Sequence, residues 1–319
     1  MKMSKSLFEN PFQIEDLFIF DDATLRSMLR SGSFDLTAEH LGRSLHGAPR
    51  FLIERSMRAM PPHLRAAFLE ELRRPTSEAE VEATRRALLD NLFWELTYWK
   101  TPELYEELIM GERIHPGIFQ QLEPALRDQT VLDAGAGSGR ASFECLRHGA
   151  KLVYAVEPSP GLLRLLEQKL ASQGLSSTGR IVARQGRFDA LPLQDESVDL
   201  ALSCSAFTAA TEQGGETGLA ELRRVTRPGG KIVLIWPRIE DQRWLLSHGF
   251  TYVRLPIQQA MTVRFRSQQS ALTCAQRFYA HNQAVVPYIL NHRLPEVPFS
   301  VIGLNPPREY CWLTVSPEH

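Results

Sequence analysis

The sequence predicts an α/β protein built on a doubly wound, mostly parallel sheet. From residue 129 onward, short apolar strand patterns alternate with helical ones, which is typical of a parallel sheet covered by helices on both faces. The strand patterns cover residues 129–133, 151–156, 180–185, 198–203 and 231–236. The segment DAGAGSGR at 133–140 ends the first strand, which is where such sheets bind ligands.

Weaker patterns complete the chain. Helices are expected over 160–173 and 217–226, and again over 267–290. Further strands are expected at 250–255, 261–266 and 309–315. Before residue 128 the apolar spacing is helical, and Ser77 with Glu80 forms a capping-box signature that opens a helical run to Trp99.

The composition limits the classes of protein to consider. The chain has 319 residues, a hydrophobic share of 43% and a formal net charge of −1, so no basic excess points to nucleic acid. No apolar stretch is long enough to predict a membrane span, and the first residues lack the features of a secretory signal. The four cysteines are scattered without a CxxC pair, which favours reduced thiols in the cytoplasm over a disulfide framework or a metal site. The oligomeric state has no signature in the sequence.

The glycine-rich segment favours a particular kind of ligand. Gly135, Gly137 and Gly139 give G-x-G-x-G, and Arg140 stands at the sixth position, where the dinucleotide fingerprint G-x-G-x-x-G has its last glycine. A carboxylate at Asp133 would repel a phosphate and suits a positively charged amino group. Glu157, at the end of the second strand, is placed to accept hydrogen bonds from two ribose hydroxyls. These features together predict a nucleoside ligand with a cationic, phosphate-free tail, a description that S-adenosylmethionine meets.

Four segments in order carry a family resemblance. VLDAGAGSGR, VEPS, GRFDALPLQDESVDLALS and ELRRVTRPGGKIVLIW resemble the motifs of class I S-adenosylmethionine-dependent methyltransferases. The nearest branch is the small-molecule one, which includes the ubiquinone and menaquinone biosynthesis enzymes. The resemblance covers roughly residues 115–255. It implies a Rossmann-like seven-stranded sheet whose last strand is antiparallel, in a domain over 115–319 with a helical insert at about 261–305. Residues 1–114 would form a helical extension that serves as a lid.

The resemblance also implies which residues contact the cofactor. They are Asp133, Gly135, Gly137, Glu157, Pro158, Phe188, Asp189 and Ser203. Asp133 would hold the amino group of the methionine part, and Glu157 the ribose. Asp189 matches the acid that accepts from the adenine amino group.

The remaining implied contacts are backbone or apolar ones. Gly135 and Gly137 would let the loop pass against the methionine part, and the backbone around Ser203 would complete that end. Pro158 and Phe188 would cover the adenine faces, although Phe188 is also a reasonable core residue. Gly139 is as well explained by close packing of a helix on a strand.

Methyl transfer by in-line displacement needs mainly alignment and exclusion of water. No histidine occurs in 203–208, where many relatives carry one, so the catalytic residue is unknown and His115 is the candidate by position. Tyr98 and Phe207 are candidate walls of the acceptor pocket. We expect a small-molecule acceptor, with oxygen or carbon slightly favoured, whereas residues 305–308 (NPPR) are better explained as a rigid turn than as an amino-methyltransferase motif.

Two other functions remain open from the sequence. A nicotinamide-dependent dehydrogenase shares the glycine loop, but Asp133 and the missing glycine at Arg140 count against it. A non-catalytic S-adenosylmethionine-binding protein is compatible with the absence of an obvious base. A nucleic-acid methyltransferase is disfavoured by the neutral charge.

Overall fold

The computed structural model describes residues 10–316, which fall into two compact units. The first unit contains the chain up to Thr101 together with Ala275–His281. The second contains Pro102–Cys274 and the chain from Asn282 onward. The units therefore divide the chain earlier than the predicted boundary at 114/115, because helix α7 (Pro102–Gly111) clusters with the second unit.

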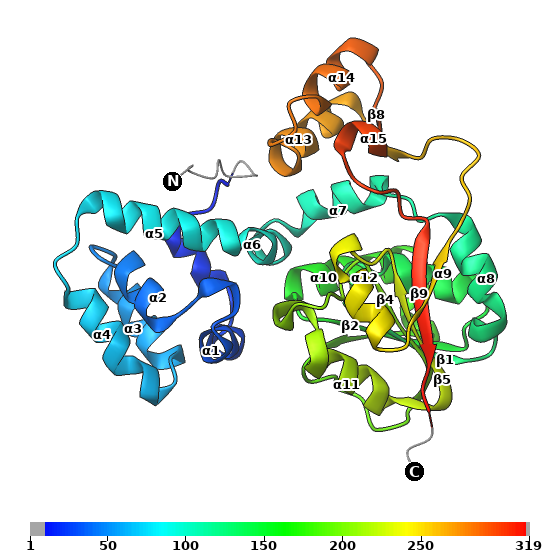
Figure 1. Cartoon of the computed structure of the whole chain (residues 1–319), viewed down its shortest axis with the longest axis horizontal. Helices are drawn as coiled ribbons and strands as arrows, with labels where there is room; N and C mark the ends of the chain where they lie inside the picture. Colours follow the sequence, from blue (N-terminus) through cyan, green and yellow to red (C-terminus); the bar gives the residue numbers. More distant parts are fainter. Residues whose placement is uncertain (1–9, 317–319) are drawn as a thin grey trace. The chain divides into compact units, whose positions relative to one another are not determined.

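The first unit is helical, and its residues from 10 to 101 are coloured blue to cyan in Figure 1. Its α-helices are α1 (Asp22–Ser31), α2 (Ala38–Ser44), α3 (Arg50–Ala59), α4 (Arg65–Arg73), α5 (Glu78–Asn91) and α6 (Phe93–Lys100). Ser77 caps α5 by accepting a hydrogen bond from the Glu80 N–H, as its sequence signature predicts. The predicted run to Trp99 is broken at Leu92, which separates α5 from α6.

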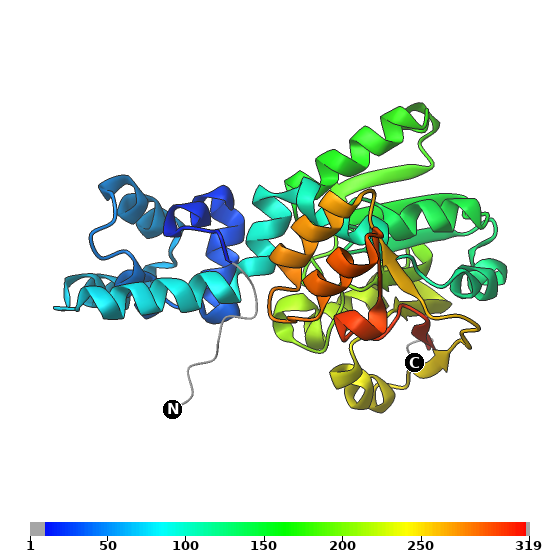
Figure 2. The same ribbon diagram turned by 90° about the horizontal axis from the view of Figure 1, so that it is seen from above.

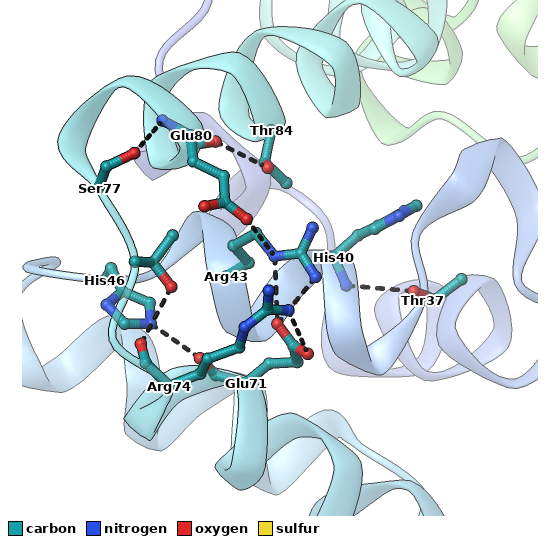
Figure 3. Close-up of polar contacts among 10 residues, drawn as sticks. Thr37, His40, Arg43, His46, Glu71, Arg74, Ser77, Glu80 and Thr84 are labelled. Carbon is teal, nitrogen blue, oxygen red and sulfur yellow. Dashed lines mark hydrogen bonds and ion pairs between the residues drawn. The ribbon is translucent and has the colours of Figure 1, made fainter.

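A polar network joins three helices of this unit (Figure 3). The Arg43 guanidinium of α2 donates twice to the Glu71 carboxylate of α4, at 3.1 and 2.9 Å, and lies 3.9 Å from the Glu80 carboxylate of α5. The hydrogen bond from Arg43 lowers the pKa of Glu71. The His46 ring contacts the Glu71 carbonyl at 2.8 Å. The network therefore fixes how α2, α4 and α5 pack, and its residues are fully explained by that structural role.

The second unit contains a seven-stranded sheet, which confirms the predicted fold class. Its strands are β1 (Thr130–Ala134), β2 (Leu152–Glu157), β3 (Ile181–Gln185), β4 (Val198–Cys204), β5 (Thr226–Ile235), β6 (Thr251–Arg254) and β9 (Glu309–Thr314). Their order is β3-β2-β1-β4-β5-β9-β6, and only β9 runs antiparallel to its neighbours. The strand order reverses between β1 and β4, so ligands are expected at the carboxyl ends of these strands.

Helices cover both faces of this sheet (Figures 1 and 2). One face packs on α8 (Pro116–Leu126), α9 (Arg140–Arg147) and α10 (Pro160–Ser172), and the other on α11 (Gly215–Val225) and α12 (Gln242–Ser247). Alternate residues of β1 enter opposite cores, since Val131 contacts the first group of helices and Leu132 the second. Burial on both faces explains why the central strands are continuous apolar runs.

The segment predicted as an insert is divided between the two units, because Ala275–His281 cluster with the first unit and its other residues with the second. Its elements are β7 (Thr262–Arg264), α13 (Gln268–Phe278), α14 (Val285–His292), β8 (Glu296–Pro298) and α15 (Phe299–Ile302). The predicted strand at 261–266 is present as β7, but it pairs with β8 outside the main sheet. The predicted helix at 267–290 is divided into α13 and α14. Helices α14 and α15 and strand β8 pack together, in orange to red in Figure 1.

Helix α7 is fastened to the rest of the second unit by acidic side chains. Glu103 pairs with Arg164 of α10 at 2.6 Å, and Glu106 pairs with Lys169 of the same helix at 2.5 Å. Glu107 pairs with Arg266 and accepts a hydrogen bond from Ser270, both in the insert. The helix therefore has charged contacts with α10 and with the insert.

Candidate active site

The glycine loop leaves β1 in a conformation that favours glycine. Gly135, Gly137 and Gly139 have φ values of 71°, 56° and 92°, a region in which residues with a Cβ are strained. The Gly135 and Ala136 N–H groups both donate to the Val156 carbonyl of β2, at 2.9 and 3.0 Å. The loop is therefore folded back between the ends of β1 and β2.

The three glycines differ in their surroundings. A Cβ on Gly135 would lie 2.5 Å from the Ala206 Cβ and 3.2 Å from the Phe188 ring. A Cβ on Gly139 would lie 2.5 Å from Leu166 of α10, which supports the helix-packing role of that glycine. A Cβ on Gly137 would meet no atom within 4 Å. Gly137 is therefore the point of the loop that is open to a ligand.

Glu157, the last residue of β2, lies directly beside this open point. One carboxylate oxygen accepts from the Gly137 N–H at 2.9 Å, and the other accepts from the Ser159 N–H at 3.0 Å. The side chain is almost fully buried, with 4% of the residue exposed. Each carboxylate oxygen has two lone pairs, so these two N–H donors leave acceptor capacity for a ligand.

Asp133 is fully buried beneath the loop. One of its oxygens accepts from the Ser142 hydroxyl of α9 at 2.6 Å, while the other is buried with no hydrogen-bond partner among residues 10–316. Burial raises the pKa of Asp133 to about 6, although the Ser142 hydrogen bond opposes that shift. The Ser203 hydroxyl of β4 is likewise buried and unpartnered in the described part of the chain. Unsatisfied buried polar atoms are rare and need an explanation, and a polar ligand would supply one.

The predicted adenine contacts are less uniform. The Phe188 ring points to the glycine loop and meets Phe207 edge to face, with ring centroids 5.3 Å apart. Pro158 directly follows Glu157, and its carbonyl accepts from Gln185 at 3.1 Å. Asp189 is half-exposed and forms an ion pair with Arg187 at 3.2 Å.

On the β4 side, Arg140 spans the point where the strand order reverses. Its guanidinium donates to the Glu112 carbonyl at 3.0 Å and contacts the Cys204 sulfur, at the end of β4, at 3.6 Å. The Glu112 carboxylate lies 3.9 Å away. Burial raises the pKa of Tyr105 on α7, near Arg140 and Glu157. In the sequence, Arg140 stands out only because it replaces the last glycine of the dinucleotide fingerprint. An arginine on the first turn of a helix does not predict a buried contact with Cys204.

The exits of β4 and β5 carry left-handed residues that are not glycine. Ser205 and Trp236 have φ values of 60° and 55°. The Trp236 indole donates to the Asn305 carbonyl at 3.0 Å and meets Phe299 of the insert edge to face. Such conformations are costly and cluster at functional sites. The contacts of Trp236 with Asn305 and Phe299 join the exit of β5 to the insert and to segment 305–308, which the sequence predicts as a rigid turn.

The other candidates have clear local contacts. His115 is the N-cap of α8, because its ring nitrogen accepts from the Gly117 N–H at 3.1 Å. Phe207 is buried beside Gly214 and Phe188. Tyr98 belongs to the first unit, where its ring stacks on Trp94. A structural role therefore accounts for His115.

The described residues contain neither a metal-ligand cluster nor a membrane-spanning helix. Within 10–316 no three histidine, cysteine or acidic side chains are grouped as metal ligands would be. Over the same range, no helix combines the length and apolar character of a membrane span.

Comparison with known proteins defines the class of this domain. Residues 131–230, from β1 into β5, match the family model of a methyltransferase domain. With the glycine loop, Glu157 and the strand order, this match identifies the core of the second unit as a class I S-adenosylmethionine-dependent methyltransferase domain. The prediction of the family is confirmed, S-adenosylmethionine is the cofactor of this class, and the dehydrogenase alternative is not supported.

The relatives are themselves uncharacterized. A methyltransferase-like protein of Schizosaccharomyces pombe is 32% identical over 118 residues, which are 36% of this chain and 42% of that protein. A methyltransferase of Mycobacterium tuberculosis is 33% identical over 135 residues, 42% of this chain and 50% of its own length. The chain thus spans about half the length of the curated relatives it matches. A solved S-adenosylmethionine-dependent methyltransferase from Aquifex aeolicus is 20% identical, with a TM-score of 0.38, over 45% of this chain and 83% of that one.

Proposed function

We propose that this protein transfers the methyl group of S-adenosylmethionine to a small-molecule acceptor. The observation that carries the proposal is the open space at Gly137, which Glu157 borders and beneath which Asp133 has an unsatisfied buried oxygen. The cationic amino group of S-adenosylmethionine would satisfy the unpartnered Asp133 oxygen, and its ribose hydroxyls would add hydrogen bonds to Glu157. The unpartnered Ser203 hydroxyl supports the same ligand at the β4 side.

Different residues would contact the ribose, the amino group and the adenine of the cofactor. Glu157 would accept from the ribose hydroxyls, and Asp133 would face the amino group. Phe188 and Pro158 would cover the faces of the adenine. Asp189 would leave its ion pair with Arg187 and accept a hydrogen bond from the adenine amino group. Gly135 would let the loop approach the methionine part. The cofactor supplies a methyl group on a positively charged sulfur, which leaves the protein to align the acceptor and exclude water.

The acceptor would enter from the β4 and β5 side. Phe207 supports a partly apolar pocket wall there, and Tyr98 stays a predicted pocket residue. Oxygen and carbon are the acceptor atoms we favour, and an acceptor that is already nucleophilic would need no general base from the protein. We propose a cytoplasmic location, which the four buried thiols of Cys145, Cys204, Cys274 and Cys311 support.

The test measures binding and turnover separately. The full chain is equilibrated with labelled S-adenosylmethionine and, in parallel, with NAD, and retention is measured. We expect retention of S-adenosylmethionine alone, and retention of NAD alone would overturn the proposal. The bound protein is then offered a panel of small phenols, enols, amines and a mixed RNA, and methyl incorporation is followed by mass spectrometry. Methylation of RNA alone would overturn the small-molecule acceptor, and cofactor binding without methylation of any acceptor would favour the non-catalytic alternative.

A further inference from the structure

Ser138, in the middle of the glycine loop, is held by two helices. It is fully buried, its hydroxyl donates to the Glu106 carboxylate of α7, and the Lys169 ammonium of α10 donates to that hydroxyl at 3.0 Å. Lys169 also donates to the Ser138 carbonyl at 3.2 Å. Both the backbone and the side chain of one loop residue are therefore fixed by charged groups.

The two charged groups also pair with each other. The Lys169 ammonium lies 2.5 Å from the Glu106 carboxylate, and their side chains are only 26% and 16% exposed. Partial burial weakens the screening of such a pair, and hydrogen bonds to charged groups are stronger than neutral ones. The contact with Ser138 is therefore expected to be persistent.

The position of Ser138 decides what this contact does. Its neighbours are Gly137, whose N–H donates to Glu157, and Gly139, which packs on α10. The Gly135 and Ala136 amides are held by the Val156 carbonyl, and the Gly139 N–H donates to the Ala136 carbonyl. The residue between the two later glycines, Ser138, is held by Glu106 and Lys169. A shift of Ser138 would move the Gly137 N–H away from Glu157 and change the open space at Gly137.

We propose that Glu106 and Lys169 are positioning residues, which hold the glycine loop through Ser138 in the conformation that receives the cofactor. The proposal rests on the proposed function for its effect on binding, although the geometry of the loop stands without it. It also gives α7 a role in the cofactor site, because one acid of that helix sets the shape of the loop.

The chain provides a matched control on the same two helices. Glu103 of α7 pairs with Arg164 of α10 at 2.6 Å, but both side chains are more than half exposed and neither has a contact with the loop among the described hydrogen bonds. If Glu106 served only to dock α7 on α10, Glu103→Gln and Glu106→Gln would have similar effects. If it positions the loop, only Glu106→Gln would change the cofactor site.

The experiment compares Glu106→Gln, Lys169→Met, Ser138→Ala and Glu103→Gln in the full chain. Binding of S-adenosylhomocysteine is measured by calorimetry, with the Tm as a check on folding. We expect Glu106→Gln and Lys169→Met to weaken binding by about tenfold to a hundredfold, and Glu103→Gln to leave it within about twofold. The double variant Ser138→Ala/Glu106→Gln should be little weaker than either single one, because both remove the same contact.

A second readout does not depend on any ligand. Hydrogen exchange of the amides at 135–139 should be faster in Glu106→Gln than in the parent protein, and unchanged in Glu103→Gln. Equal effects of the two glutamate variants on binding and exchange would overturn the proposal, as would normal exchange in Glu106→Gln. If the parent protein failed to bind S-adenosylhomocysteine but showed the expected exchange difference, the proposed function would be wrong and the positioning role would stand.

Discussion

At the carboxyl edge of the sheet, the chain leaves β1 in a different way from β4 and β5. β1 exits through glycines, and its loop is held by the Val156 carbonyl and by Glu157. β4 and β5 exit through Ser205 and Trp236, which adopt left-handed conformations in spite of their side chains. The exit of β1 thus presents backbone to a ligand, whereas the exits of β4 and β5 present side chains. We infer that the exit of β1 serves a ligand shared by a whole class, and the other two exits an acceptor particular to this protein.

The largest expected effect is the loss of the Glu157 carboxylate. Glu157→Gln removes an acceptor of two buried N–H groups and of the proposed ribose hydroxyls, so affinity for S-adenosylhomocysteine should fall by about a hundredfold or more. Calorimetric titration measures this, with Glu144→Gln, which breaks only a surface pair with Arg147, as the control. Unchanged affinity in Glu157→Gln would show that the cofactor does not bind at the exits of β1 and β2.

The open space at Gly137 can be tested by filling it. Gly137→Ala adds a methyl group where no protein atom lies within 4 Å, at a φ of 56°. Gly174→Ala, at a φ of 67° with equally open surroundings, carries the same backbone strain away from the site. Both variants should lose about 1 kcal/mol of unfolding free energy, while only Gly137→Ala should lose cofactor binding, by more than about tenfold.

Parallel denaturation and binding curves would separate the two effects. If Gly137→Ala and Gly174→Ala both bound the cofactor normally, Gly137 would not be the point of ligand approach. The comparison of the strand exits would then lose its main support on the β1 side.

A smaller effect concerns the pH dependence of cofactor binding. Since burial raises the pKa of Asp133 from 3.8 to about 6, the folded protein holds a proton that the unfolded chain has released. The stability from this group is complete below about pH 4 and is lost as the pH rises through about 6. A cationic amino group favours the ionised carboxylate, so affinity should rise about tenfold from pH 5 to pH 7.

Titration calorimetry at pH values across this window measures that rise. In Asp133→Asn the dependence should disappear, because no carboxyl group is left to exchange its proton. A profile that stayed equally steep in Asp133→Asn would assign the proton to another group.

The smallest effect is expected at His115, the residue predicted from the sequence as a candidate catalytic group. Because its ring caps α8, His115→Ala should cost about 1 kcal/mol of unfolding free energy and leave kcat within about twofold. A general base would instead contribute at least about a hundredfold to the rate. The kcat of His115→Ala is measured with any acceptor found in the panel. A fall in kcat of that size without loss of stability would show that His115 acts as the general base.

The sequence predicted the features that have a local pattern and missed the contacts that join distant parts of the chain. The strands of the main sheet were recognised because burial on both faces leaves continuous apolar runs, and the glycine loop because its conformation requires glycine. The contact between Arg140 and Cys204 joins residues 64 positions apart, and Glu106 lies 32 positions from Ser138. Contacts of this kind leave no periodic pattern. The break at Leu92 and the pairing of β7 with β8 were missed for a related reason, since neighbours from elsewhere in the chain decide them.

The charged fastening of α7 has a practical consequence for handling the protein. Helix α7 packs through buried apolar residues such as Leu108 and Ile109, and Glu103, Glu106 and Glu107 also link it to basic side chains of different exposure. At about 1 M salt the Debye length falls to about 3 Å, but partly buried pairs are screened much less than exposed ones. High salt should therefore weaken the exposed Glu103–Arg164 pair first, whereas the Glu106–Lys169 contact with Ser138 should persist, so salt used during purification should leave the glycine loop intact.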